Sequence, residues 1–249
     1  MAKFKGIFEI EGTLQGMTFY KSKDGMMVRT KGGVSKDRIM NDPAFERTRE
    51  NGQEFATCAK AAQLFRLSIL DKIDLAKDHR TQSRMISLMH AVKKLDEVST
   101  RGARNMATAL QEPGAKALFV GFDFNRNSKV GQLLVAPFAL DTAMGTLEAT
   151  GLTPGQQLKY PPAATEADLQ LVAVRIDFAT ETYTASESGK TTLASTGAAE
   201  DLTLTVSEVP AGEGVLLYLL LIEFYQQLNG QRYPLKNRQF NAMSVLAAE

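Results

Sequence analysis

The sequence has few of the residues that most often build metal, disulfide and nucleophilic sites. It contains no tryptophan, one cysteine (Cys58) and two histidines (His79 and His90) among 249 residues. A single cysteine excludes an intramolecular disulfide and agrees with a reducing compartment. The histidines lie on one predicted helix, about 16 Å apart along its axis, so they cannot share a metal ion. We therefore predict no metal and no cofactor.

Long apolar runs are also missing. The longest, Val215 to Ile222, is far shorter than the roughly 20 residues that a membrane-spanning helix needs. Near the N-terminus, Glu9 and Glu11 interrupt the chain before any apolar stretch of signal-peptide length. These features predict a cytoplasmic protein with no membrane partner.

The net charge of +1 hides an uneven distribution of charge along the chain. Residues 1–112 carry 20 Lys and Arg against 14 Asp and Glu, whereas residues 113–249 carry 9 against 14. Opposite charges can steer copies of a chain into head-to-tail association. They can equally face each other within one chain, and the sequence leaves both interpretations open.

Residues 1–40 are predicted to form a glycine-rich β-hairpin arm. Met17 to Lys21 and Met26 to Thr30 favour strands, and Lys23-Asp24-Gly25 between them offers residue types that tolerate a tight turn. Two strands alone are marginally stable in water, so such an arm needs a partner on which to dock.

Residues 41–112 are predicted to be helical. Asp42 is a suitable N-cap and Pro43 suits the first helical position, although Asn51-Gly52 is a potential interruption. A second helix is expected to begin between Asp78 and Thr81, because apolar residues then recur at helical spacing. A short third helix is expected between Ser99 and Glu112, before Pro113-Gly114 ends the helical region.

Residues 113–249 are predicted to form an antiparallel β-sandwich of immunoglobulin type, which makes the fold class α+β. The expected strands include Lys116 to Phe124, Gln170 to Phe178 and the central Val215 to Tyr225, and Asn229-Gly230 indicates a hairpin. Gly189 to Ala199, rich in small and polar residues, is expected to be an exposed loop.

No motif predicts an enzyme. Ser188-Gly189-Lys190-Thr191 resembles the end of a phosphate-binding loop, but Thr184 stands where that motif requires another glycine, so we interpret it as an ordinary turn. Cys58 lies among alanines on a helical segment and is expected to be a packed core residue. The carboxylates show no recognisable acid–base pair.

One group of cations is a candidate basic face on the predicted helices. Its members are Arg80, Arg84, Lys93, Lys94, Arg101 and Arg104. Such a face can contact nucleic-acid phosphates. Since the chain is nearly neutral and acidic residues are interspersed, a solvated or inter-subunit face is the preferred interpretation, and nucleic acid is not the expected partner.

Three segments carry a resemblance to known sequences: Glu11 to Tyr20, Met27 to Gly33 and Asn41 to Asn51. They resemble uncharacterised Bacteroidota proteins of unknown function that are associated with prophage-like regions. The resemblance covers about the first 70 residues. It implies no activity, cofactor or catalytic residue, but it favours a structural role.

We therefore expect a non-enzymatic, self-assembling structural protein, such as a component of a filament, tube or phage-like particle. The arm would make the subunit contacts of a homo-oligomer through Met17, Phe19, Val28 and Arg29. One alternative is a carbohydrate- or protein-binding module that uses loops such as Thr153 to Thr165. A further alternative is a nucleic-acid-associated protein, and the residues identify no small-molecule ligand.

Overall fold

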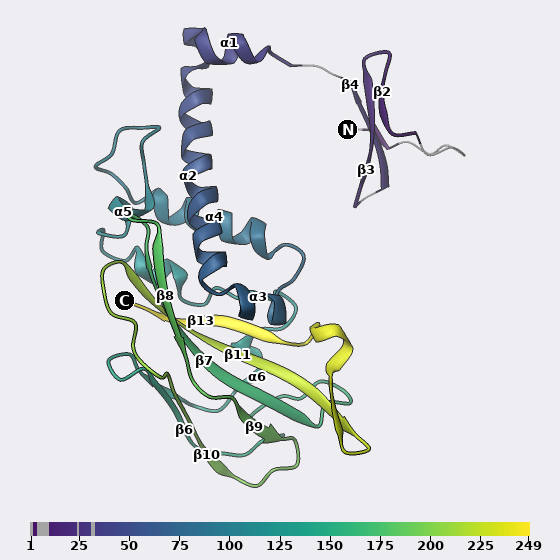
Figure 1. The fold of residues 1–249 in the computed structure, drawn as a ribbon, viewed down its shortest axis with the longest axis vertical. Helices are drawn as coiled ribbons and strands as arrows, with labels where there is room; N and C mark the ends of the chain where they lie inside the picture. The colour runs from purple at the N-terminus through teal and green to yellow at the C-terminus, as the bar shows by residue number, and fades with distance from the viewer. Residues whose placement is uncertain (1, 4–9, 24, 31–32) are drawn as a thin grey trace. The chain divides into compact units, whose positions relative to one another are not determined.

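The computed structural model describes residues 2–3, 10–23, 25–30 and 33–249 (Figure 1). The chain divides into two compact units, Met1–Arg49 and Glu50–Glu249. The predicted arm belongs to the first unit. The predicted helical region from Glu50 onward and the predicted β domain together form the second unit, because the helices and the sheet share one core; residues 41–49 of the predicted helical region belong to the first unit.

The first unit contains a four-stranded antiparallel sheet in the order β1-β4-β3-β2. The strands are β1 (Ala2–Lys3), β2 (Gly12–Leu14), β3 (Met17–Ser22) and β4 (Gly25–Thr30). The predicted hairpin of β3 and β4 is confirmed, while Asp24 of its predicted turn lies outside the described residues. Gln15 and Gly16 join β2 to β3 with φ values of 49° and 79°, as a type I′ turn requires.

The first unit becomes helical earlier than predicted. Helix α1 (Lys36–Asn41) begins within the expected β arm, because the Ser35 hydroxyl accepts the Arg38 N–H at 3.3 Å and caps the helix. The expected start at Asp42 is a 3₁₀ turn, η1 (Pro43–Phe45), in which the Asp42 carboxylate accepts the Ala44 N–H at 2.9 Å.

Four helices follow: α2 (Glu46–Ser68), α3 (Leu70–Ala76), α4 (Thr81–Lys93) and α5 (Met106–Ala109). Helix α2 runs unbroken through Gly52, and α4 begins where the sequence predicted. The predicted third helix is reduced to the four residues of α5. The Asp96 carboxylate accepts the backbone N–H groups of Ser99 and Asn105, and these bonds hold the preceding residues in a turn.

The larger sheet of the second unit is antiparallel and has the path β12-β11-β7-β8, with β13 paired to β11 and β9 paired to β7. Its strands are β7 (Glu166–Asp177), β8 (Thr182–Glu187), β9 (Thr191–Ala194), β11 (Val215–Leu228), β12 (Gln231–Pro234) and β13 (Ala242–Ala248). The central place of β11 is confirmed. The Asn229-Gly230 hairpin is confirmed too, with φ of 51° and 77°. Strand β9 corrects the prediction of an exposed loop over 189–199.

A smaller antiparallel sheet has the order β10-β6-β5. It consists of β5 (Ala139–Asp141), β6 (Thr146–Leu152) and β10 (Glu200–Thr205). The short elements η2 (Lys116–Phe119), α6 (Val130–Leu133) and η3 (Leu235–Arg238) complete the second unit.

The predicted strand Lys116 to Phe124 is wrong. It consists of η2 and turns, although the N–H groups of Gly121 and Phe124 donate to carbonyls of β13. Phe119 and Phe124 are buried and pack edge-on against Phe65, with ring centroids 6.0 and 5.7 Å away. The segment therefore covers the helical core, and it meets the sheet only through these bonds and a single bridge between Asp123 and Ser244.

Both faces of β11 are buried, which explains its nearly continuous apolar sequence. Leu217, Leu219 and Leu221 lie in the core that contains α2, α3 and α4. Leu216, Leu220 and Ile222 lie in a second core with residues of the smaller sheet. Each cluster consists of residues from Cys58 onward, so the second unit has a complete core of its own. The fold is mixed: a hairpin unit, a helical segment and a curled antiparallel sheet.

Candidate functional site

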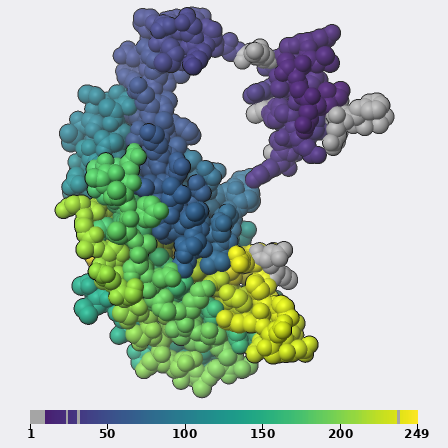
Figure 2. Space-filling view, in the orientation of Figure 1, coloured from purple at the N-terminus to yellow at the C-terminus, as the bar shows by residue number. Residues whose placement is uncertain are grey.

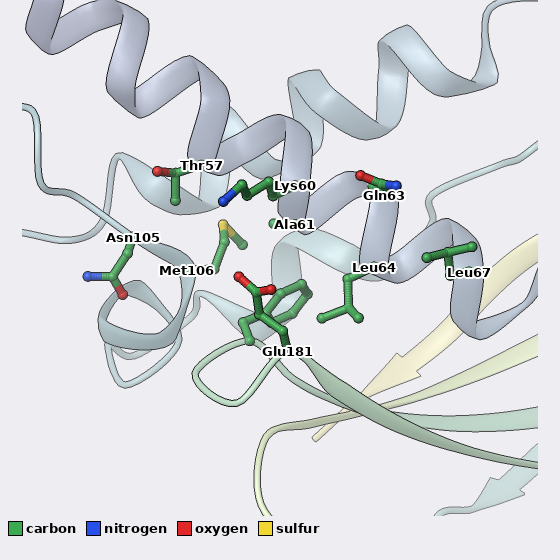
Figure 3. Close-up of a pocket in the computed structure, with 10 residues that line it drawn as sticks. Thr57, Lys60, Ala61, Gln63, Leu64, Leu67, Asn105, Met106 and Glu181 are labelled. Carbon is green, nitrogen blue, oxygen red and sulfur yellow. The ribbon is translucent and has the colours of Figure 1, made fainter.

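A pocket of about 440 Å³ lies in the second unit between α2, the start of α5 and the β7–β8 turn (Figure 3). Helix α2 contributes Thr57, Lys60, Ala61, Gln63, Leu64 and Leu67; α5 and the residue before it contribute Asn105 and Met106, and the turn contributes Phe178 and Glu181. The α2 residues follow the three- and four-residue spacing of one helix face.

Local hydrogen bonds fix the walls of the pocket opposite α2. The Asn105 side chain caps α5 by accepting the Thr108 N–H at 2.9 Å. In the β7–β8 turn, the Asp177 carboxylate accepts the Thr180 hydroxyl at 2.7 Å and the Ala179 N–H at 2.8 Å. These two bonds lower the pKa of Asp177 below its usual value. They hold the turn that carries Glu181, whose φ is 56°.

The pocket combines an apolar surface with charges at its rim. Leu64 and Met106 supply apolar contacts, while Lys60 and Glu181 are exposed and of opposite sign. Cys58 does not line it. The thiol is buried, and burial raises its pKa, so it is a packed residue and not an activated nucleophile. The arrangement suits the binding of an amphipathic side chain or ligand.

A second hollow, of about 190 Å³, continues along α2 and α3 beside β8. Its lining includes Ser68, Ala185 and the ion pair of Lys72 with Glu187, whose Nζ and Oε2 lie 2.5 Å apart. Burial opposes the charge of Lys72, but its bonds to Glu187 and Asp71 raise its pKa above the usual value. The first hollow borders the turn before β8 and the second borders β8 itself, and the two together are called the α2–β8 groove here.

Strand β8 borders this groove and has an open edge. Ser188 donates its backbone N–H to Leu171 of β7, whereas the Glu187 carbonyl accepts from Ser207 on the other side. Backbone groups alternate in direction along an antiparallel strand, so those of Tyr183 and Ala185 point away from β7. Within the described part of the chain, no backbone group forms a hydrogen bond with Tyr183 or Ala185 on the side away from β7.

The predicted assembly residues do not all share one surface. Met17, Phe19 and Val28 lie on one face of the first unit's sheet, where Phe19 pairs with Val28. Met17 is 38% exposed, and its cross-strand neighbour Leu14 is 57% exposed, whereas Phe19 is only 9% exposed. Arg29 lies on the opposite face, with its guanidinium 5.5 Å from the Tyr20 ring centroid.

The structure does not bring the six predicted basic residues together on one exposed face. Lys93 is buried and donates to Glu54, and Arg84 pairs with Asp78 at 2.6 Å. The Arg101 Nε lies 3.3 Å from Oε2 of Glu50. Arg104 is half-buried, whereas Arg80 and Lys94 are exposed. Helical spacing places Lys93 on the same side of α4 as Met89, a signal that could have identified it as interior.

The other predicted sites have structural roles. His90 packs against Phe55 with ring centroids 5.6 Å apart, and His79 is exposed. Lys190 of the phosphate-loop-like segment pairs with Glu223 at 2.6 Å and is followed by β9, not by a helix. In the loop Thr153 to Thr165, the Tyr160 hydroxyl donates to the Leu193 carbonyl at 2.9 Å and ties the loop to β9.

Among the described residues, no group of three or more His, Cys, Asp or Glu side chains is placed to hold a metal ion. The helices of the described residues all lack the length and hydrophobicity that a membrane crossing requires. No family model, curated protein or solved structure matches the chain.

Proposed function

We propose that this protein is a self-assembling structural protein whose N-terminal unit makes the contacts between copies in a homo-oligomer. The proposed assembly is a filament, a tube or a phage-like particle, as the sequence leads us to expect. The observation that carries the proposal is how few apolar side chains are buried among the described residues of the first unit. Among its described residues, Phe19 is the only buried apolar side chain.

A folded unit with so little burial is marginal in water and gains stability by covering its apolar side chains. Leu14 and Met17 are cross-strand neighbours on β2 and β3, and both are exposed. Complete burial of a side chain of this size contributes about 1.5–3 kcal/mol. An interface that covers the pair therefore stabilises both the first unit and the contact with a neighbouring copy.

Charge supports association between copies. The first unit carries 10 Lys and Arg against 6 Asp and Glu, and the second carries 19 against 22. Opposite potentials steer two copies toward a head-to-tail encounter. A contact between two different surfaces of one chain generates rings or open filaments, depending on whether it closes.

The test compares the intact chain with the double variant Leu14→Asp/Met17→Asp. Thr13→Asp/Thr18→Asp is the matched control, because it places the same two charges on neighbouring strand positions of the opposite face. Particle size is measured by light scattering and negative-stain microscopy at equal concentration. We expect large particles for the intact chain and the control, and protomers for Leu14→Asp/Met17→Asp. A monomeric intact chain, or normal assembly of that variant, would contradict the proposal.

A binding module is the second candidate function, and the pocket beside α2 supports it. Its volume of about 440 Å³ lies within the range of small-molecule sites. If the intact chain is monomeric, this candidate predicts that a glycan or peptide ligand raises the melting temperature. The variant Leu64→Arg, which places a charge in the pocket, should then abolish that rise.

A further inference from the structure

We infer that the open edge of β8, together with the α2–β8 groove, receives the N-terminal unit of a second copy by strand addition. This inference rests on the proposed function and names the surface that accepts the contact. It starts from the backbone of β8. Tyr183 and Ala185 each present one N–H and one carbonyl on the side facing away from β7.

Ser207 and Glu208 cover the end of β8 at Ser186 and Glu187, but over Tyr183 and Ala185 the strand lacks the features that usually protect an edge. Natural edge strands are blunted by proline, lysine or a covering segment. The sequence Thr182–Glu187 contains neither proline nor lysine, and Tyr183 is 44% exposed. In Figure 2 the green atoms of the β7–β8 hairpin lie at the surface beside the blue atoms of α2. An extended segment can therefore pair with the edge through backbone hydrogen bonds.

The groove supplies places for the side chains of an added strand. Every second side chain of such a strand lies on the same side of the sheet as Tyr183 and Ala185, which is the side of α2. Leu64 and Phe178 line the larger hollow at one end, and Leu67 there is 37% exposed. Leu14 and Met17 of the first unit are exposed and apolar, so they suit this apolar lining.

Charge selects the first unit as the occupant. Residues 177–189 contain Asp177, Glu181 and Glu187 and no Lys or Arg; Lys72 of α3 pairs with Glu187, so an excess of two acids remains. The first unit has an excess of four positive charges, so its approach to this hairpin is electrostatically favourable. Symmetric pairing of β8 with β8 of another copy would instead bring like charges together, which is destabilising. The arm of a second copy is therefore the occupant that fits.

The first experiment blocks the edge in the full-length chain. Ala185→Pro removes an N–H that points away from β7, so the ladder inside the sheet keeps its bonds. The matched control is Thr203→Pro on β10. The backbone N–H of Val206 donates to Gly145 on the β6 side, and Leu204, two residues earlier, points to the same side. Because backbone groups alternate along the strand, the N–H of Thr203 points away from β6. We expect Ala185→Pro to lose assembly and the control to keep it.

Tyr183→Lys provides a second block that leaves the backbone unchanged and adds a positive charge at the edge, which repels the positively charged first unit. It should also abolish assembly, and it decides the question if Ala185→Pro fails to fold by circular dichroism. If a folded β8 variant assembles as well as the intact chain while Leu14→Asp/Met17→Asp does not, the inference is overturned and the proposed function stands. If the intact chain is itself monomeric, both are overturned.

A mixing experiment tests whether the two surfaces belong to one junction. Ala185→Pro can donate its N-terminal unit but cannot accept one, whereas Leu14→Asp/Met17→Asp can accept but cannot donate. Each variant alone should run as a protomer, and an equimolar mixture should form dimers that grow no further. Protomers in the mixture would show that β8 is not the acceptor of the N-terminal unit.

Discussion

Replacement of Lys93 by methionine is the perturbation that most directly tests how the helices are held together. Lys93 at the end of α4 is buried and donates to the carboxylate of Glu54 on α2. The same carboxylate accepts the Gly102 N–H at 2.9 Å. Methionine keeps an unbranched apolar stem of nearly the same length but removes the charge, so Glu54 keeps a buried charge without its principal partner.

Removal of one partner from a buried ion pair typically costs about 3–5 kcal/mol. The Gly102 bond and the nearby charge of Arg104 persist, so we expect about 3 kcal/mol, the lower end of this range. With a urea dependence of about 2–3 kcal/mol per molar, the unfolding midpoint falls by about 1–1.5 M. Lys94→Met is the matched control, because Lys94 is the next residue and is exposed; it should change stability by less than about 0.5 kcal/mol.

The pH dependence distinguishes a lost ion pair from a packing defect. Burial alone raises the pKa of Glu54, but the bonds from Lys93 and Gly102 and the charges of Lys93 and Arg104 bring it below its usual value. In the intact protein this carboxylate adds stability above its unfolded pKa, and the contribution is lost as the pH falls through the folded pKa. Without Lys93 the effect of burial prevails, so the cost of Lys93→Met should shrink on acidification from pH 7 toward pH 4.

The assay is urea unfolding followed by circular dichroism at several pH values. The double variant Glu54→Gln/Lys93→Met should recover at least half of the lost stability, since no unpaired charge remains. Equal midpoints for Lys93→Met and Lys94→Met, or a cost that does not change with pH, would refute the buried ion pair.

Two further substitutions probe packing. Cys58→Ala should lower the free energy of unfolding by at most about 1 kcal/mol, because it removes one small buried group. A thiol reagent should label Cys58 slowly in the native chain and rapidly in the urea-unfolded chain. Rapid labelling of the native chain would place the thiol at the surface. Gly214→Ala should lower stability by more than about 2 kcal/mol, since the added Cβ would lie 2.1 Å from the Ile176 carbonyl oxygen at a φ of +96°, whereas Gly189→Ala, with open space around it, should leave the urea midpoint unchanged.

Local rules predicted the elements whose sequences carry a complete local signal. Apolar residues at helical spacing indicated α4, and Asn229-Gly230 identified its hairpin because both residues adopt positive φ readily. The segment Lys116 to Phe124 shows where such rules fail. Its apolar residues suit a strand, but Gly114 and Gly121 adopt φ near +80° and turn the chain, and the partner that buries Phe119 is Phe65 on α2.

The candidate site was less predictable than the fold, because its residues meet through contacts between distant parts of the chain. Lys93 and Lys94 are identical in type, and only the position of Lys93 on the apolar side of α4 separates them. The partner of Lys93, Glu54, is 39 residues away in the sequence. The open edge of β8 depends on strand order, which periodicity does not encode, so Tyr183 and Ala185 carried no signal in the sequence.

The structure also changes the meaning of the uneven charge. Residues 50–112 contain 10 Lys and Arg and 8 Asp and Glu. Several of these residues form ion pairs with each other, among them Lys93 with Glu54 and Arg84 with Asp78. The positive excess of the N-terminal part therefore comes mainly from the first unit, and not from a basic face on the helices. That unit is also the one with a single buried apolar side chain among its described residues. Apolar exposure and unbalanced positive charge coincide on one small element, and the acidic, strand-accepting surface proposed above would relieve both at once.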